Sequence, residues 1–582
     1  MRHIGGIAGD GIVAVVLHAQ RVEPLQESVG GALTGVLRHH DAADVQPLSF
    51  AAEKPQIVQY NLIVEDNGMS THWEDEDGNI VDLYGSSYAP AARRANARSG
   101  AYDIPSSYDA RTDGLVTSVK DQGFDGSCWA FAATSCVESS IIKSGLADNT
   151  VDLSEGHLLW FAKNNLTTDA SDRTYGDGEN SDLNTARKIG GTWMDSVSTY
   201  ARGSGPVYDA DYPYSVGTWP DSDRYSAEFR LTDCSLIKNE AANISQIKRA
   251  IMDNGSVKTS YYNHTYYYNV TDTASSYYYP GATETNHDVA IVGWDDNYSK
   301  ENFRSDYRPS SDGAWLVKNS WGDDILLKDG YFWMSYEESS LGYVYSFDFT
   351  KNDHLGIYQY DGTQNPLCSA SITYTNIADV YKVTEDKENL TAVSIGSKSI
   401  GVAYKLKIYT NLQDPNNPIA GTLTIEQEET IQNVGMNYVQ LNKEISLQNG
   451  NYYAIVIEPR YGQQLNIFAD QTNTKYSDVQ YQCDYSNEYC MLKNGNNWLK
   501  QGEGNNSLTY RIKGITNKYT LNKTSMNLAV GNSEQLIASQ SCGSWRSSNT
   551  GIATVDTNGN VKGVGQGKTT ITYKVNGIEL SC

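Results

Sequence analysis

The stretch DQGFDGSCWAFA, Asp121–Ala132, places a cysteine directly after the turn-forming DGS and at the start of an apolar run. Apolar residues recur at helical spacing as far as Gly145, a residue suited to end a helix, so we predict a helix that begins near Cys128. A cysteine in the first turn of a helix meets unpaired backbone N–H groups and the positive end of the helix dipole, and both favour a thiolate. Cys128 is therefore a candidate nucleophile, although its position alone also fits a small buried core residue.

Three distant residues supply what a cysteine nucleophile requires. His287 opens the apolar segment HDVAIVGW, predicted as a buried strand that aims the imidazole as a base. Asn319 lies in AWLVKNSWG, a second predicted strand, and its side-chain carbonyl can fix the tautomer of the imidazole. Gln122 and the Cys128 backbone N–H can donate to an oxyanion. Taken singly, these residues also fit a core histidine, a turn-forming asparagine and a surface amide.

Together these residues resemble the papain-like cysteine peptidases. The resemblance is carried by IPSSYDAR, VKDQGFDGSCWAFA, GPVYDADYPY, NHDVAIVGWDD and GAWLVKNSWG, which follow one another over about residues 104–347. It implies an α+β fold of two lobes, with Cys128 as nucleophile and His287 as general base and then general acid. It also implies that Asn319 orients His287 and that Gln122 helps to form the oxyanion hole.

The resemblance extends to the surroundings of these residues. It implies that Trp321 lies over the histidine–asparagine pair at the substrate cleft, and that Trp129 and Phe131 belong to the core. Asp288 follows His287 directly and is expected either to line the substrate cleft or to be a solvated loop acid.

Two departures from the family pattern are visible. Asp125 stands where many members have a disulfide cysteine, and no cysteine between Cys136 and Cys234 is present to serve as its usual partner. Loss of such a bridge lowers stability by about 2–4 kcal/mol without touching the chemistry. The segment between His287 and Asn319 contains the polar stretch DDNYSKENFRSDYRPSSDG, predicted to be a long surface loop near the cleft.

Composition limits the remaining possibilities. A chain of 582 residues suggests three or four domains. The formal net charge of −25 lacks the basic footprint of a nucleic-acid binder, and we expect no nucleic-acid partner. The sequence has no stretch of transmembrane length, no CxxC pair of metal-ligand spacing and no sign of a cofactor. The 42 tyrosines favour β-rich regions.

Disulfide pairing and the N-terminal region remain open at this stage. Two bridges are considered, Cys483–Cys490 and Cys542–Cys582, and either would indicate maturation outside a reducing cytosol. Residues 1–50 differ in composition from the rest and make a poor export signal, which is also consistent with a wrongly assigned start. Residues 51–103 are predicted to be a short propeptide and linker, which ends in the protease-sensitive AARRANARSG.

The peptidase region, predicted over residues 104–350, is followed by β-rich sequence. Residues 351–515, beginning near DHLGIYQYDG, resemble the lectin-like domain found after this type of peptidase in bacterial surface proteins. Residues 516–582 resemble bacterial group 2 Ig-like domains, with a hairpin turn at Asn558-Gly559. The predicted fold is therefore an α+β papain-like peptidase followed by two all-β sandwiches. No set of residues in the lectin-like region establishes sugar or calcium binding.

The leading hypothesis is a secreted or cell-surface cysteine endopeptidase, matured by removal of a propeptide. Its partner would be a protein or peptide substrate, with a cell-wall or host surface ligand for the two β domains. The alternative is a non-catalytic surface adhesin that keeps the peptidase fold as a scaffold. A cysteine transferase is disfavoured because that class more usually has Asp as the third member, where this chain has Asn319.

Overall fold

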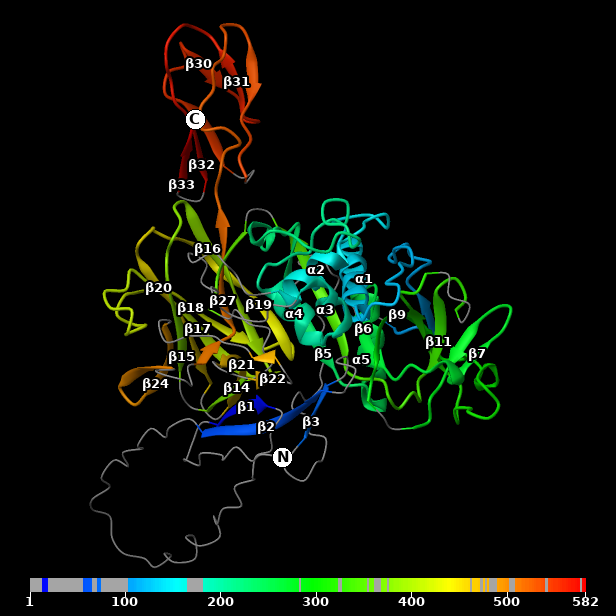
Figure 1. Cartoon of the computed structure of the whole chain (residues 1–582). Helices are drawn as coiled ribbons and strands as arrows, with labels where there is room; N and C mark the ends of the chain where they lie inside the picture. Colours follow the sequence, from blue (N-terminus) through cyan, green and yellow to red (C-terminus); the bar gives the residue numbers. More distant parts are fainter. Residues whose placement is uncertain are drawn as a thin grey trace, which may run out of the picture.

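The computed structural model places most of the chain beyond residue 102 (Figure 1). The structure describes residues 13–18, 56–64, 71–74, 103–164, 182–281, 284–322, 327–352, 355–360, 368–373, 376–460, 463–471, 475–476, 479–480, 489–501, 508–539, 543–575 and 578–582. The strands β1 (Val13–His18), β2 (Gln56–Val64) and β3 (Thr71–Glu74) are the described part of the N-terminal region. The other expectations for residues 1–102 fall outside the described residues.

The first lobe of the peptidase region is helical. Its helices are α1 (Cys128–Lys143), α2 (Glu155–Lys163), α3 (Leu183–Lys188) and α4 (Trp193–Ala201). Helix α1 starts at Cys128 as predicted, and Gly145 just beyond its end has a φ of 71°, the left-handed conformation that glycine adopts readily. Trp129 and Val137 of α1 are fully buried and pack with residues of α2 and α4, so α1 is the central element of this lobe.

The second lobe is built from antiparallel strands and one helix. Its elements are β4 (Ser107–Asp109), β5 (Phe229–Ile237), α5 (Ile244–Asn254), β6 (Val257–Tyr261), β7 (Tyr268–Val270), β8 (Ser275–Tyr277), β9 (His287–Asp295), β10 (Ala314–Lys318), β11 (Tyr331–Ser335) and β12 (Val344–Lys351). Strand β9 pairs with β4, β6 and β10. Both predicted strands are confirmed. One face of β9 and β10 packs in a core of the second lobe, and Ala290, Val292 and Leu316 belong to the core of the first lobe.

The polar loop between β9 and β10 lies away from His287. Strand β9 begins at His287 and β10 ends at Lys318, and the two run antiparallel with Lys318 opposite Ala290. The loop after Asp295 therefore joins the opposite ends of the strands, a nine-residue strand away from His287, or roughly 25–30 Å. The prediction that this loop lies near the cleft was wrong, because an antiparallel hairpin keeps its connection at one end and its free ends at the other.

The next region is a sandwich of two antiparallel sheets. One sheet has the strand order β18-β17-β20-β15-β24-β25, and the other includes β13, β27, β16, β19, β21, β14 and β26. The longer strands are β14 (Cys368–Thr373), β15 (Ile377–Lys382), β16 (Glu388–Ser397), β17 (Ala403–Thr410), β18 (Thr422–Thr430), β19 (Gly435–Ser446), β20 (Tyr452–Pro459), β21 (Gln464–Gln471) and β27 (Ile512–Lys518). The shorter strands are β13 (Leu355–Tyr358), β22 (Lys475–Tyr476), β23 (Val479–Gln480), β24 (Tyr489–Asn494), β25 (Asn497–Lys500) and β26 (Leu508–Tyr510). Buried residues of alternating strand positions fill the space between the sheets.

This sandwich and the peptidase region share a continuous interface (Figure 1). The start of β19 pairs antiparallel with β5, Gly435 lying opposite Ser235. Met436 and Phe468 of the sandwich belong to the same apolar core as the helical lobe. Arg511, ion-paired with Asp470 at 2.8 Å in the sandwich, also donates to Ser198 Oγ of α4 at 2.7 Å. Packing, sheet pairing and buried polar contacts thus join the two regions.

The C-terminal region is a small sandwich that projects from the rest (Figure 1). Its sheets have the orders β28-β31-β30 and β29-β32-β33. The strands are β28 (Ser533–Gln535), β29 (Ser544–Ser547), β30 (Ala553–Val555), β31 (Asn560–Gly563), β32 (Ile571–Val575) and β33 (Ile578–Ser581). Strands β30 and β31 pair across the predicted turn, where Gly559 has a φ of 81°. The two proposed disulfides involve Cys483 and Cys542, which lie outside the described residues.

Candidate active site

Cys128 is the first residue of α1 and lies at the boundary between the two lobes. The thiol is fully buried, and this burial is the main reason why the pKa of Cys128 is raised to about 12. The Asp288 carboxylate acts in the same direction, whereas backbone hydrogen bonds from Asp288 and Trp129 and the charge of Lys258 favour the thiolate. The hydrogen bond with the backbone of Asp288 places the sulfur at the start of β9, the strand whose first residue is His287.

His287 and Asn319 meet as the sequence predicts. The Nε2 atom of His287 lies 2.7 Å from Asn319 Oδ1, and the Ser320 backbone N–H donates to the same oxygen at 2.8 Å. The Ser320 contact identifies the oxygen end of the amide, so His287 Nε2 is the donor and carries the proton. The neutral imidazole then has Nδ1 as its proton acceptor.

Burial sets the protonation state of His287. The residue is 5% exposed, and desolvation lowers its pKa to about 4, although the hydrogen bond that it donates to Asn319 acts in the opposite direction. Trp321 stacks on the imidazole with ring centroids 4.6 Å apart. This stacked indole covers His287, as the family resemblance implies for Trp321, and keeps water from that face of the ring.

Gln122 is tied to the same group of residues. Its side-chain Oε1 accepts from Ser320 Oγ at 2.7 Å, and its backbone N–H donates to the Ser320 carbonyl at 2.9 Å. Its Nε2 donates to the Asp125 carbonyl at 2.7 Å, and an amide nitrogen has a second hydrogen to offer. Ser320, which the sequence analysis did not single out, thus joins Gln122 to Asn319.

Asp288 has a setting that the sequence did not reveal. It is 3% exposed, and its carboxylate forms a buried ion pair with Lys258 of β6. The expectation of a solvated loop acid was therefore wrong, because an ammonium on the neighbouring strand compensates the buried charge. Its role at the substrate cleft stays a prediction.

Asp125 has polar partners in place of the missing bridge. Tyr214 donates its hydroxyl hydrogen to Asp125 Oδ2 at 2.7 Å, and Arg187 Nε lies 3.7 Å from the same oxygen. Arg187 also stacks over the Tyr214 ring at 4.8 Å. A hydrogen bond, an ion pair and a cation–π contact hold the turn before Cys128 against two distant segments.

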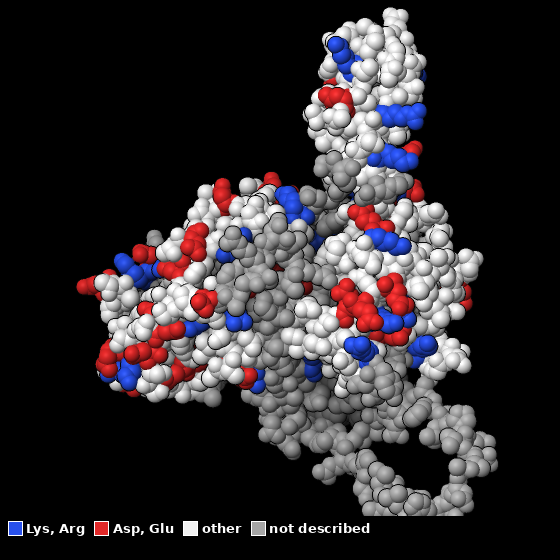
Figure 2. Space-filling model, turned by 180° about the vertical axis from the view of Figure 1, so that it is seen from behind, with Lys and Arg blue, Asp and Glu red and all other residues white. Residues whose placement is uncertain are grey.

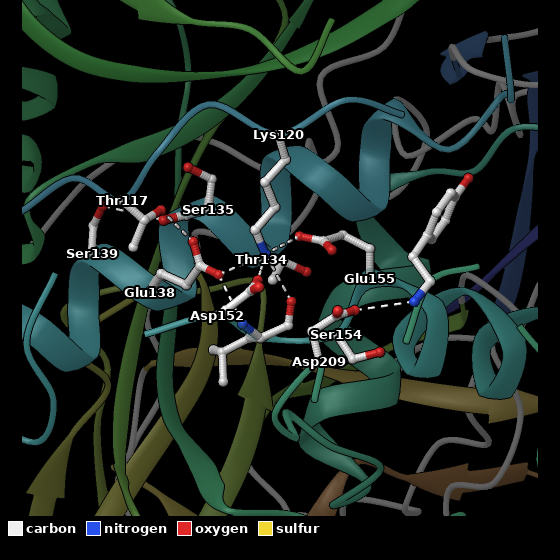
Figure 3. A network of polar contacts seen from close by, with 12 residues as sticks. Thr117, Lys120, Thr134, Ser135, Glu138, Ser139, Asp152, Ser154, Glu155 and Asp209 are labelled. Carbon is white, nitrogen blue, oxygen red and sulfur yellow. Dashed lines mark hydrogen bonds and ion pairs between the residues drawn. The ribbon is translucent and has the colours of Figure 1, made fainter. Parts of the chain in front are cut away.

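The Lys120 cluster is a second polar group that the sequence analysis did not identify. Lys120 Nζ lies 2.9 Å from Glu138, 2.6 Å from Asp152 and 2.8 Å from Glu155, and Figure 3 shows the ammonium among these carboxylates. Glu138 also accepts from Thr117 Oγ1 at 2.5 Å and from the Leu153 backbone N–H at 2.9 Å. The cluster joins α1 and α2 to the segment that carries Gln122.

Lys318 is a buried lysine that also contacts Thr117. Lys318 Nζ donates to Thr117 Oγ1 and to Ser135 Oγ, each at 3.0 Å, and burial lowers the pKa of Lys318 to about 8. Because Lys318 directly precedes Asn319, these contacts fix the end of β10 on α1. The Lys120 cluster thus holds the segment that carries Gln122, and Lys318 holds the end of β10 that leads into Asn319.

On the face seen in Figure 2, Asp and Glu side chains form several small groups, with Lys and Arg side chains beside them. Among the described residues, no group of three or more His, Cys, Asp and Glu side chains forms a metal-binding arrangement. No described helix is both long and apolar enough to span a membrane.

Comparison with known families assigns each region. Residues 104–347 match the papain family of cysteine proteases, residues 357–516 match a lectin-like domain, and residues 515–577 match the bacterial Ig-like domain of group 2. The chain thus carries a papain-family cysteine protease domain followed by lectin-like and Ig-like domains, which confirms the fold predicted from sequence.

Individual relatives agree with this assignment. Bovine cathepsin S is 31% identical over 222 residues, covering 38% of this chain and 56% of the cathepsin. Cathepsin L of Sarcophaga peregrina is 29% identical over 244 residues, covering 41% of this chain and 59% of that protein. The chain therefore spans a little over half the length of these curated relatives.

Two solved structures extend the likeness beyond the peptidase domain. The cysteine protease and lectin-like domains of Cwp84, a surface layer associated protein of Clostridium difficile, match with a TM-score of 0.59 and 25% identity, covering 75% of this chain and 91% of that chain. Clostridial Cwp84 after propeptide cleavage matches with a TM-score of 0.58 and 26% identity, covering 71% of this chain and 100% of that chain.

Proposed function

We propose that this protein is a cysteine endopeptidase that hydrolyses peptide bonds through Cys128, His287 and Asn319. The observation that carries the proposal is the 2.7 Å contact between His287 Nε2 and Asn319 Oδ1, in a papain-family domain that has Cys128 at the start of a helix. The contact leaves Nδ1 of a neutral imidazole as the atom that accepts the thiol proton. A thiol, a neutral base and an orienting amide are the parts that nucleophilic catalysis requires.

The reaction follows from these groups. His287 Nδ1 takes the proton of Cys128, and the thiolate attacks the scissile carbonyl carbon. The backbone N–H of Cys128 and the second Nε2 hydrogen of Gln122 stabilise the oxyanion. His287 then gives the proton to the leaving amine, which departs and leaves a thioester. A water molecule, deprotonated by His287, hydrolyses the thioester and regenerates the thiol.

Burial favours the neutral form of both groups before substrate binds. The pKa of Cys128 is raised to about 12 and that of His287 is lowered to about 4. Proton transfer between them creates a thiolate and an imidazolium together, and their mutual attraction opposes the desolvation that each would suffer alone. The N–H groups at the start of α1 and the Lys258 ammonium stabilise the thiolate further.

The pH profile provides a test of the base. His287 has to be neutral to accept the thiol proton, so kcat/KM for a peptide substrate is expected to fall as the pH drops through about 4. The Asn319 hydrogen bond raises the pKa of His287, so Asn319→Ala is expected to move this acid limb to lower pH. A wild-type limb near the ordinary imidazole value of 6.5, unmoved in Asn319→Ala, would contradict the assignment.

We propose further that the enzyme acts at the cell surface and is matured by removal of residues up to about 95–105. The surface location is supported by the Ig-like domain and by the likeness to the surface layer associated protein Cwp84. Maturation is supported by the basic, alanine-rich segment AARRANARSG that precedes the peptidase domain and by the propeptide cleavage described for Cwp84. The substrate class is protein or peptide.

Mass spectrometry of the purified chain beside Cys128→Ala tests activity and maturation together. The wild type is expected to acquire an N-terminus at about residues 95–105, whereas Cys128→Ala keeps its original start because it lacks the nucleophile. An epoxysuccinyl peptide is expected to modify Cys128 and not Cys136, which lies two turns further along α1 and serves as an internal control. A folded wild type that is not modified and cleaves no peptide library would leave the adhesin alternative standing.

A further inference from the structure

A pocket of about 600 Å³ lies in the peptidase domain, next to its junction with the lectin-like domain. Its wall runs from Val207 to Glu228 and is completed by Asn352, which follows the last strand of the peptidase domain. The Asn352 backbone N–H donates to the Glu228 carbonyl at 3.0 Å and closes this end of the pocket. Neither Cys128 nor His287 lines the pocket, so it is distinct from the candidate active site.

Aromatic rings form much of the lining. Tyr208, Tyr212, Trp219 and Tyr225 all contribute. Tyr212 and Trp219 contact each other edge-on with centroids 5.7 Å apart, and the Tyr212 ring also packs on the buried His157 at 5.0 Å. Tyr225 is 41% exposed at the rim. Contacts in the protein interior hold the inner rings, so their orientation does not depend on a ligand.

Hydrogen-bond acceptors are placed among these rings. The carboxylates of Asp211, Asp223 and Glu228 line the pocket. The Asn352 amide also lines it, but its oxygen accepts from Arg230 at 3.1 Å and its nitrogen donates to the Ala227 carbonyl at 2.6 Å. None of the described residues that line it is a lysine, arginine or histidine, so an anionic ligand would meet the carboxylates of Asp211 and Asp223. Glu228 is already paired with Lys351 at 3.1 Å, so the pocket is less suited to bind a single cation.

The combination of rings and acceptors matches a neutral sugar. A pyranose has an apolar C–H face, which packs on aromatic rings, and a rim of hydroxyl groups, which donate to carboxylate and amide oxygens. Such hydroxyl–carboxylate hydrogen bonds are charge-assisted and directional. The volume falls in the range of ordinary ligand pockets. We propose that this pocket binds a neutral oligosaccharide on the peptidase domain, in addition to any ligand of the lectin-like domain.

Binding is tested in the full chain carrying Cys128→Ala, so that the result does not depend on peptidase activity. The probes are a β-linked N-acetylglucosamine trimer and a mannose trimer. Their binding is measured by calorimetry and by ligand-observed NMR. Saturable binding of either trimer supports the proposal, and the preferred trimer separates a cell-wall type of glycan from a mannose-rich one. No binding of either trimer at millimolar concentration overturns it.

Variants of the rings locate the binding. Trp219→Ala and Tyr225→Ala are each expected to raise the Kd about threefold to tenfold, the loss of one aromatic contact. Because Tyr225 is exposed, Tyr225→Ala is expected to fold even if Trp219→Ala does not. The matched control is Tyr266→Ala, another tyrosine of the peptidase domain, which is 48% exposed and lies outside the pocket. Unchanged affinity in Tyr225→Ala and Trp219→Ala, or binding of a lysine-rich peptide in preference to both trimers, overturns the proposal.

Discussion

Replacement of His287 by alanine is expected to lower kcat/KM for a peptide substrate by about 10⁴-fold or more, because the thiol then has no base to take its proton. Without the imidazole, the Cys128 thiol has a pKa raised to about 12 by burial, and only a trace of thiolate remains at neutral pH. The measurement is the initial rate of peptide cleavage by equal amounts of folded protein, after the N-terminal segment has been removed from both proteins by the same unrelated protease.

The matched control for this variant is His264→Ala. His264 is an exposed histidine of the same lobe, and its alanine variant is expected to stay within about twofold of the wild type. If His287→Ala keeps more than about a tenth of wild-type activity, while circular dichroism shows an intact fold, then His287 is not the base and the proposed mechanism is wrong.

The second large effect concerns stability. Lys120→Met is expected to lower the free energy of unfolding by about 3–5 kcal/mol, because it leaves Glu138 and Glu155 buried without their shared cation. Burial raises the pKa of Glu155 to about 7 even in the presence of Lys120, and Glu138 acts in the same direction. Urea unfolding of the Cys128→Ala chain, which cannot digest itself, measures the change.

The effect of Lys120→Met should depend on pH in one direction. In the variant the folded-state pKa of Glu155 lies further above its unfolded value, so folding takes up a proton and is favoured at low pH. The stability loss is therefore expected to be larger at pH 8 than at pH 5. Lys188→Met, at an exposed lysine of α3, is the control and should change stability by no more than about 0.5 kcal/mol. An equal loss for both variants would contradict the role given to the Lys120 cluster.

Local pattern was sufficient to predict the elements that position the candidate catalytic residues. The helix at Cys128 and the strands at His287 and Ala314 are confirmed, because each has an apolar period or run bounded by turn-forming residues. The contact between His287 and Asn319 followed from the family resemblance, since nothing in either strand alone specifies its partner.

Long-range polar pairs were out of reach of the sequence. Asp125 was recognised as a missing disulfide position, but its partner Tyr214 is 89 residues away and has no pattern that points back to it. Lys258 and Asp288 pair across neighbouring strands, a register that sequence alone did not provide. Glu138 and Glu155 also gave no clear signal, since α1 contains several serines and Glu155 stands in the first turn of α2, where an acidic residue is common.

The strand pairing of β5 with β19 changes the meaning of the domain boundary near residue 350. The family matches divide the chain there, but Met436 and Phe468 complete the core of the helical lobe and Arg511 bonds to its α4 helix. A protease domain cut out at that point would expose an apolar patch and an open strand edge, both of which favour aggregation. The unit that keeps its core covered is therefore the protease domain together with its lectin-like neighbour.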